Sequence, residues 1–226
     1  MTDAQFMTDS RTSAISTNRV LRNTYMLLSM TLLFSASMAA VAMAMNAPYM
    51  GFIPLLVSFA LIFAISKFKN SGWGIVLVFA FTGILGFALG PVLNHYMASQ
   101  AGSQTVVTAA GLTGIIFLSL SGYALMSKKD FSFMGGFLIA GMWVVIGSML
   151  LMFVGSFFGW YVSGLQLAIS AAVVMLMSGF ILFDTSRIIN GGETNYIMAT
   201  LAIYLDVYNV FTNLLALLGI VGGNRD

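Results

Sequence analysis

Seven long apolar segments, separated by short polar connections, restrict this chain to very few folds. A helix of about 20 apolar residues spans a hydrocarbon core of ~30 Å, whereas the strands of a membrane barrel are ~10-residue segments of alternating polarity. Charged residues make up only 7% of the chain, against about a quarter in soluble domains. The sequence therefore predicts an all-α, polytopic membrane protein, a bundle of seven transmembrane helices. Their approximate limits are Tyr25–Met45, Met50–Ser66, Gly72–Leu93, Val106–Met126, Phe133–Val154, Trp160–Phe183 and Tyr196–Leu218.

The polar N-terminal region differs from the rest of the chain. Residues 1–20 are rich in Ser, Thr and Asn and show no helical apolar stripe, which is typical of a flexible segment. Short connections between the apolar segments favour antiparallel packing of neighbouring helices. We therefore expect a flexible cytoplasmic tail, 1–20, and a single seven-helix transmembrane domain, 21–226.

Basic residues set the expected orientation in the membrane, because cytoplasmic loops carry an excess of Lys and Arg. With seven spans, only Arg225 would lie on the outer side. The N-terminus should therefore be cytoplasmic and the C-terminus periplasmic in a bacterial inner membrane. The basic residues on the opposite, cytoplasmic side would be Arg11, Arg19, Arg22, Lys67, Lys69, Lys128, Lys129 and Arg187.

Several kinds of chemistry are excluded by composition. The chain has no cysteine and one histidine, His95, so disulfides, thiolate metal sites and the two-histidine zinc protease motif are excluded. The few basic residues are explained by topology and do not suggest nucleic-acid binding. We expect no cofactor, and the sequence does not predict an oligomeric state.

One carboxylate stands in the middle of the last apolar segment. Asp206 has no other charged residue within a dozen positions on either side. An ionised carboxylate facing lipid costs several kcal/mol, so Asp206 should face protein or water, and it marks a functional site. Asn209 and Asn213 share its helical face at i+3 and i+7, and Tyr208 flanks this supporting polar face. Alternatively, the two asparagines simply hydrogen-bond neighbouring helices.

A second carboxylate, Asp184, lies near the end of the sixth segment. Asp206 is ~16 Å along its helix from Asn195, and Asp184 is only ~8 Å from Ile189, so the sequence leaves open whether the two meet. If they do, both cannot ionise cheaply, and they titrate as a unit. When ionised, the pair could bind calcium weakly, with water and main-chain carbonyls completing a shell of 6–8 oxygens. Lys67 and Arg187 are candidate counter-charges, or alternatively only topology anchors.

Several short motifs connect the chain to one family. They are Phe183-Asp184-Thr185, Tyr204-Leu205-Asp206, Tyr208-Asn209-Val210-Phe211, Phe79-Ala80-Phe81-Thr82-Gly83, Gly90-Pro91 and Lys129-Asp130-Phe131-Ser132-Phe133. Together they resemble the Bax inhibitor-1 family over nearly the whole chain. Two further runs resemble its bacterial inner-membrane branch, namely Arg19-Val20-Leu21-Arg22-Asn23-Thr24-Tyr25 and Gly191-Gly192-Glu193-Thr194-Asn195-Tyr196.

The resemblance implies a seven-helix bundle with the last helix in the centre. Some members of the family conduct calcium passively, gated by pH through two aspartates, here Asp184 and Asp206. In those members a basic residue at the cytoplasmic end of helix two latches one aspartate. That position falls near Lys67, and a lysine cannot reproduce a bidentate arginine clamp. The bacterial branch includes a modulator of a membrane-bound AAA metalloprotease.

These observations lead to two functional hypotheses. The first is a pH-sensitive passive cation leak, for calcium, gated by the two aspartates. The alternative is a module that binds and regulates a membrane-bound AAA protease through the N-terminal tail. An intramembrane aspartyl protease would carry Gly-x-Gly-Asp where this chain has Ile203-Tyr204-Leu205-Asp206, so we expect no enzymatic activity.

Overall fold

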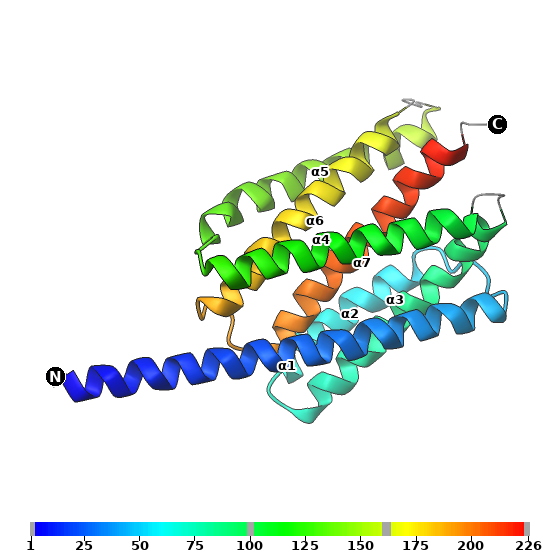
Figure 1. The fold of residues 1–226 in the computed structure, drawn as a ribbon. Helices are drawn as coiled ribbons and strands as arrows, with labels where there is room; N and C mark the ends of the chain where they lie inside the picture. The colour runs from blue at the N-terminus through cyan, green and yellow to red at the C-terminus, as the bar shows by residue number, and fades with distance from the viewer. Residues whose placement is uncertain (1–2, 99–101, 160–163, 224–226) are drawn as a thin grey trace. The chain divides into compact units, whose positions relative to one another are not determined.

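The structure, a computed structural model, describes residues 3–98, 102–159 and 164–223, with side chains described for 17–98, 102–159 and 164–220. Within these residues the chain is helical and contains no strand, and all seven predicted helices are present (Figure 1). A single 3-10 turn, η1 (Ser132–Met134), precedes the fifth helix. The helices are α1 (Asp3–Ala44), α2 (Ile53–Phe68), α3 (Gly72–Met97), α4 (Gly102–Ser127), α5 (Gly135–Phe157), α6 (Leu165–Ile189) and α7 (Tyr196–Gly223).

Two helices differ in length from a typical transmembrane span of about 20 residues. α1 begins at Asp3, well before the predicted limit at Tyr25, although its apolar, span-like part starts only at Thr17. α2 has 16 residues, so it is ~24 Å long and falls short of a ~30 Å hydrocarbon core. Six helices are therefore long and apolar enough to cross a membrane among the described residues, and α2 is a shorter apolar helix. The division into a tail, 1–20, and one domain, 21–226, stays a prediction.

The helices form two compact units. The first unit comprises Met1–Ala98 with Arg187–Tyr204, and the second comprises Ser99–Ser186 with Leu205–Asp226. In the first unit both α1 and α2 pack along α3. Gly86 on α3 is pressed against the backbone of Ser35, so that a Cβ atom there would overlap the Ser35 carbonyl group. Small residues of this kind allow membrane helices to approach closely.

The second unit contains α4, α5, most of α6 and the larger part of α7. α5 and α6 approach each other at three glycines. A Cβ atom on Gly179 would lie 2.6 Å from Leu138, one on Gly141 would lie 2.5 Å from Leu176, and one on Gly135 would lie 3.0 Å from Phe183. Ile181 and Val210 are fully buried. These contacts fix the end of α6 that carries Asp184.

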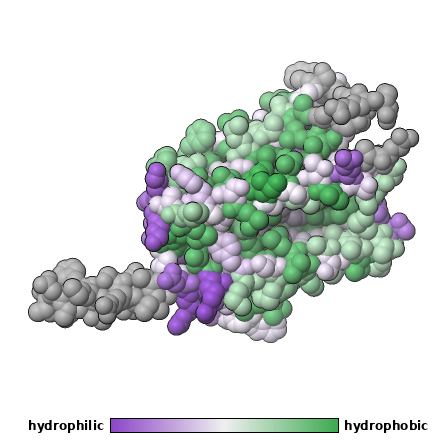
Figure 2. All heavy atoms as spheres, viewed as in Figure 1, coloured by the Kyte–Doolittle hydropathy of each residue, from purple (hydrophilic) through white to green (hydrophobic). Residues whose placement is uncertain are grey.

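On the face shown in Figure 2, hydrophobic residues cover most of the coloured surface, and hydrophilic residues form a few patches near its edges. Leu33, Phe63 and Trp143 are each more than two-thirds exposed. Exposed apolar surface on this scale is unfavourable in water but matches a lipid environment. The exposure pattern is that of a membrane protein.

Candidate functional site

The two membrane aspartates lie together in the second unit. Asp206 on α7 is 6% exposed, and its side chain is hydrogen-bonded to that of Asp184 on α6. Asp184 is half-buried. The contact that the sequence left open is therefore present.

The contact forms although the two residues lie at unequal distances from their helix ends. α6 ends at Ile189 and α7 begins at Tyr196, so Asp184 is ~8 Å and Asp206 ~15 Å from the nearer helix end. The connection 190–195 can absorb this difference, because extended residues advance up to about 3.3 Å each. Its path is fixed at one end by Gly191, at φ +74°, and by the backbone N–H groups of Gly192 and Glu193, which both donate to the Arg187 carbonyl.

Asn195 fixes the other end of this connection. Its Oδ1 accepts hydrogen bonds from the backbone N–H groups of Ile197 and Met198, at 3.0 and 3.1 Å, as an N-cap residue does. Its Nδ2 donates to the Lys69 carbonyl at 3.0 Å. One side chain thus starts α7 and ties its first turn to the end of α2.

A hydrogen bond between two carboxyl groups has a chemical requirement. A carboxylate only accepts hydrogen bonds, so at least one member of the pair must carry a proton. The second oxygen of Asp206, Oδ2, is buried and has no hydrogen-bond partner among the described residues. Unsatisfied buried polar atoms are rare and often mark functional groups. A carboxyl pair in this arrangement can therefore hold one proton between its two members.

Two neighbours of Asp184 hold the end of α6 in place. Thr185 Oγ1 lies 3.3 Å from Ser121 Oγ of α4. Ser186 Oγ accepts from the Phe131 backbone N–H at 2.9 Å and donates to the Lys129 carbonyl at 3.1 Å. Both side chains are fully buried. The role of Thr185 and Ser186 was not predicted from the sequence, although three successive polar residues at the end of an apolar helix are a visible signal.

The predicted supporting residues are satisfied mainly by α7 itself. Asn209 Nδ2 donates to the Leu205 carbonyl at 2.8 Å, and Asn213 Nδ2 donates to the Asn209 carbonyl at 2.9 Å. The amide nitrogens thus bond within the helix and not to neighbouring helices. Tyr208 is half-buried beside them. Their part in ion chemistry stays a prediction.

The two candidate counter-charges lie in the first unit. Arg187 Nη2 is 4.0 Å from Glu193 Oε2, and both side chains are partly exposed, so this ion pair contributes little to stability. Lys67 is exposed in the last turn of α2. Their role toward the aspartates also stays a prediction.

Comparison with known proteins connects the chain to one family over almost its full length. A family model described as "Inhibitor of apoptosis-promoting Bax1" matches residues 17–223. A protein of Escherichia coli K12 named "Modulator of FtsH protease YccA" is 47% identical over 92% of this chain and 93% of its own length. A Vibrio cholerae "Uncharacterized membrane protein" is 48% identical over 96% of both chains. The protein of another Escherichia coli strain, named "Inner membrane protein YccA", is 47% identical over the same shares as the K12 protein.

Proposed function

Because the chain belongs to the Bax inhibitor-1 family, we propose that this multi-pass inner membrane protein modulates a membrane-bound protease of the FtsH type. The observation that carries this proposal is the almost end-to-end match with a relative that is named as a modulator of that protease. The role is regulatory and not enzymatic. The polar region 1–20 ahead of the first apolar span is the segment that we propose contacts the protease.

Degradation of a membrane substrate tests this proposal. The protease and a short-lived membrane substrate are co-expressed with the full chain, with a variant lacking residues 2–20, or with no addition. We expect the full chain to lengthen the half-life of the substrate and the truncated variant, inserted at the same level, to have no effect. A variant with residues 2–20 in scrambled order is the matched control for length and composition. An unchanged half-life with the full chain would overturn the proposal.

A second function is supported by the carboxyl pair itself. We propose that Asp184 and Asp206 form a proton-controlled gate for a passive cation leak, with calcium as the transported ion. Loss of the shared proton leaves two carboxylates that repel each other and break their hydrogen bond. Up to four hard oxygens then become available to a cation. Weak binding follows, because water and carbonyl groups must supply the remaining ligands.

The leak requires α7 to line the pathway. We therefore propose that α7 is the central helix of the bundle. This is supported by the contribution of α7 residues to both compact units and by the burial of Tyr204, Val210 and Leu215 along it. We also propose that the N-terminus is cytoplasmic and the C-terminus periplasmic, which the distribution of basic residues favours.

Calcium entry into liposomes separates the leak from the protease role. Purified protein is reconstituted with a calcium-sensitive dye inside, and flux is measured from pH 5 to pH 8. We expect flux to rise with pH, and to lose its pH dependence in Asp184→Asn and Asp206→Asn. Asp130→Asn is the matched control, since it makes the same change on an exposed loop residue. Equal flux and pH response in all four proteins would eliminate the leak.

A further inference from the structure

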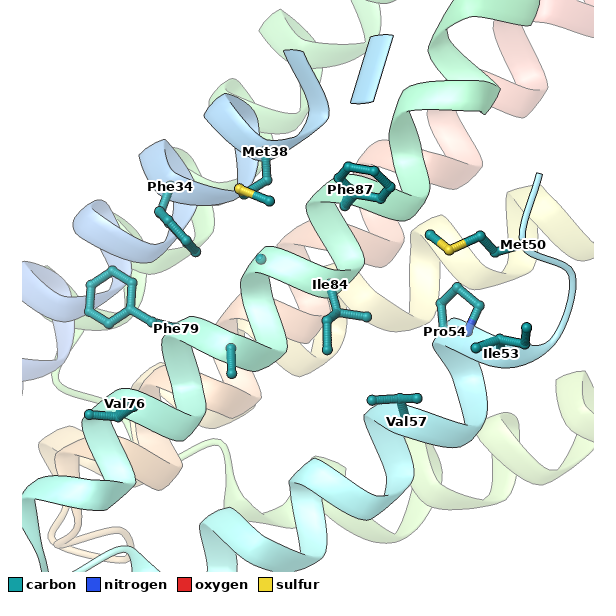
Figure 3. A pocket seen from close by; sticks show the side chains of 12 residues that line it. Phe34, Met38, Met50, Ile53, Pro54, Val57, Val76, Phe79, Ile84 and Phe87 are labelled. Carbon is teal, nitrogen blue, oxygen red and sulfur yellow. The ribbon is translucent and has the colours of Figure 1, made fainter. Parts of the chain in front are cut away.

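The first unit contains an apolar groove that the functions proposed above do not use. It has a volume of about 660 Å³ and lies on α3, with α1 along one side and α2 with the residues just before it along the other (Figure 3). Phe34 and Met38 of α1 point into it, as do Val57 of α2 and Ile84 of α3. Every lining residue is apolar.

The shape of the groove depends on a small residue. A Cβ atom on Gly83 would lie 2.7 Å from the Phe34 ring, so only glycine leaves that ring its position against α3. The ring of Phe34 then meets that of Phe79 edge-to-face, with centroids 5.4 Å apart. This is a favourable aromatic geometry. The wall of the groove is therefore a packed surface.

The length of the groove suits an extended alkyl chain. Its α3 floor runs from Val76 to Phe87, which is ~16 Å at 1.5 Å per residue. This length is close to the ~15 Å of one leaflet of a ~30 Å hydrocarbon core.

Three basic residues lie beyond one end of the groove, as measured along the helices. Gly83 lies against Phe34 and Gly90 against Ala42, so positions advance in the same direction on both helices and α1 and α3 run parallel. Arg22 lies ~18 Å before Phe34 along α1. Lys67 and Lys69 immediately precede the start of α3 at that same end. None of these three cations is in an ion pair with any residue whose side chain the structure describes.

We propose that the groove binds one acyl chain of an anionic phospholipid, with the lipid phosphate held by Arg22, Lys67 and Lys69. Charge complementarity selects the anionic headgroup, since basic clusters beside membrane helices attract such lipids. The apolar walls of the groove favour binding of the acyl chain of the lipid. This goes beyond protease modulation and cation passage, and it does not depend on either.

Lipid retention measured by native mass spectrometry tests this proposal. The full chain, purified in a neutral detergent, is titrated with phosphatidylglycerol or with phosphatidylcholine carrying the same acyl chains. We expect one phosphatidylglycerol to be retained at a concentration at least fivefold lower than phosphatidylcholine. Lys67→Gln/Lys69→Gln should reduce this preference at least threefold, whereas Lys128→Gln/Lys129→Gln should leave it unchanged.

A filling variant tests the groove itself. Ala80 lines the groove and is exposed on α3, and Ala110 is also exposed, on α4 outside the groove. Ala80→Trp should abolish retention of the single phosphatidylglycerol, and Ala110→Trp should not. Equal retention of the two lipids, or an unaltered titration in Ala80→Trp, overturns the proposal. If the mass spectra showed a dimer that was lost only in Ala80→Trp, the groove would bind a second copy of the protein. That result would also overturn the lipid proposal.

Discussion

The hydroxyl group of Tyr204 on α7 lies 2.7 Å from the Oγ of Ser35 on α1, although 169 positions separate the two residues in the chain. The same hydroxyl group donates to the Thr82 carbonyl of α3 at 3.3 Å, and the Tyr204 ring packs edge-to-face on Phe81. Tyr204 is 1% exposed. One side chain thus joins three helices of the first unit, two positions before Asp206.

Removal of this hydroxyl group should destabilise the first unit. Tyr204→Phe loses the hydrogen bonds to Ser35 and to the Thr82 carbonyl and leaves the buried Ser35 hydroxyl group without its partner, so we expect a loss of about 1–2 kcal/mol. The measurement is unfolding of the purified protein in mixed micelles as the denaturing detergent is increased. Tyr49→Phe, at a residue that is 76% exposed, is the control and should unfold like the wild type. Equal stability of Tyr204→Phe and Tyr49→Phe would contradict this account.

The carboxyl pair should make stability depend on pH. The Asp184–Asp206 hydrogen bond needs a proton that the unfolded chain releases well below neutral pH. A native state that binds more protons than the unfolded state loses stability as pH rises. We therefore expect a lower melting temperature at pH 8 than at pH 5, and a smaller difference in Asp184→Asn, where the amide donates without titrating.

Asp130 provides the matched control for that pH series. Hydrogen bonds from the side chain and the backbone N–H of Ser132 hold the pKa of Asp130 below its ordinary value. A lowered pKa contributes stability that is present above the unfolded value and lost only as pH falls below it. The melting temperature of Asp130→Asn should therefore differ between pH 5 and pH 8 by as much as that of the wild type. A difference reduced as much as in Asp184→Asn would show that the pair is not its source.

Loss of the α7 cap should weaken the start of that helix. Asn195→Ala removes the side-chain acceptor for two backbone N–H groups and the donor to the Lys69 carbonyl. N-cap substitutions of this kind cost about 1 kcal/mol. Hydrogen exchange at the amides of Ile197 and Met198 should accelerate about fivefold or more. Asn195→Asp retains the side-chain acceptor of the cap and should keep slow hydrogen exchange at both amides. If exchange in Asn195→Asp were as fast as in Asn195→Ala, the side chain of Asn195 would not act as a cap.

A methyl group at the contact between α1 and α3 should be costly. Gly86→Ala places a Cβ atom against the Ser35 backbone, and overpacking of this kind typically costs about 1–3 kcal/mol. Gly111→Ala on α4 adds the same methyl group where nothing lies within 4 Å, so its stability should not fall. Detergent-unfolding midpoints of the two variants provide the comparison. Equal unfolding midpoints of Gly86→Ala and Gly111→Ala would mean that α1 and α3 can move apart at this contact without a loss of stability.

The sequence by itself determined the membrane class and the number of helices. A backbone inside hydrocarbon must satisfy its own hydrogen bonds, so each long apolar run becomes a helix wherever it packs. The sequence also identified Asp206 as a candidate site residue, because an isolated carboxylate in an apolar run has a high free-energy cost wherever it faces lipid. Both conclusions depend on local composition alone.

Only the tertiary structure decided which side chains meet. The contact between Asp184 and Asp206 depends on the offset of two helix ends. The same holds for the Tyr204–Ser35 hydrogen bond and for the groove beside Gly83, each of which needs a particular helix rotation. Tilt, rotation and offset are set by packing between helices and by short connections such as 190–195, and hydropathy does not encode them.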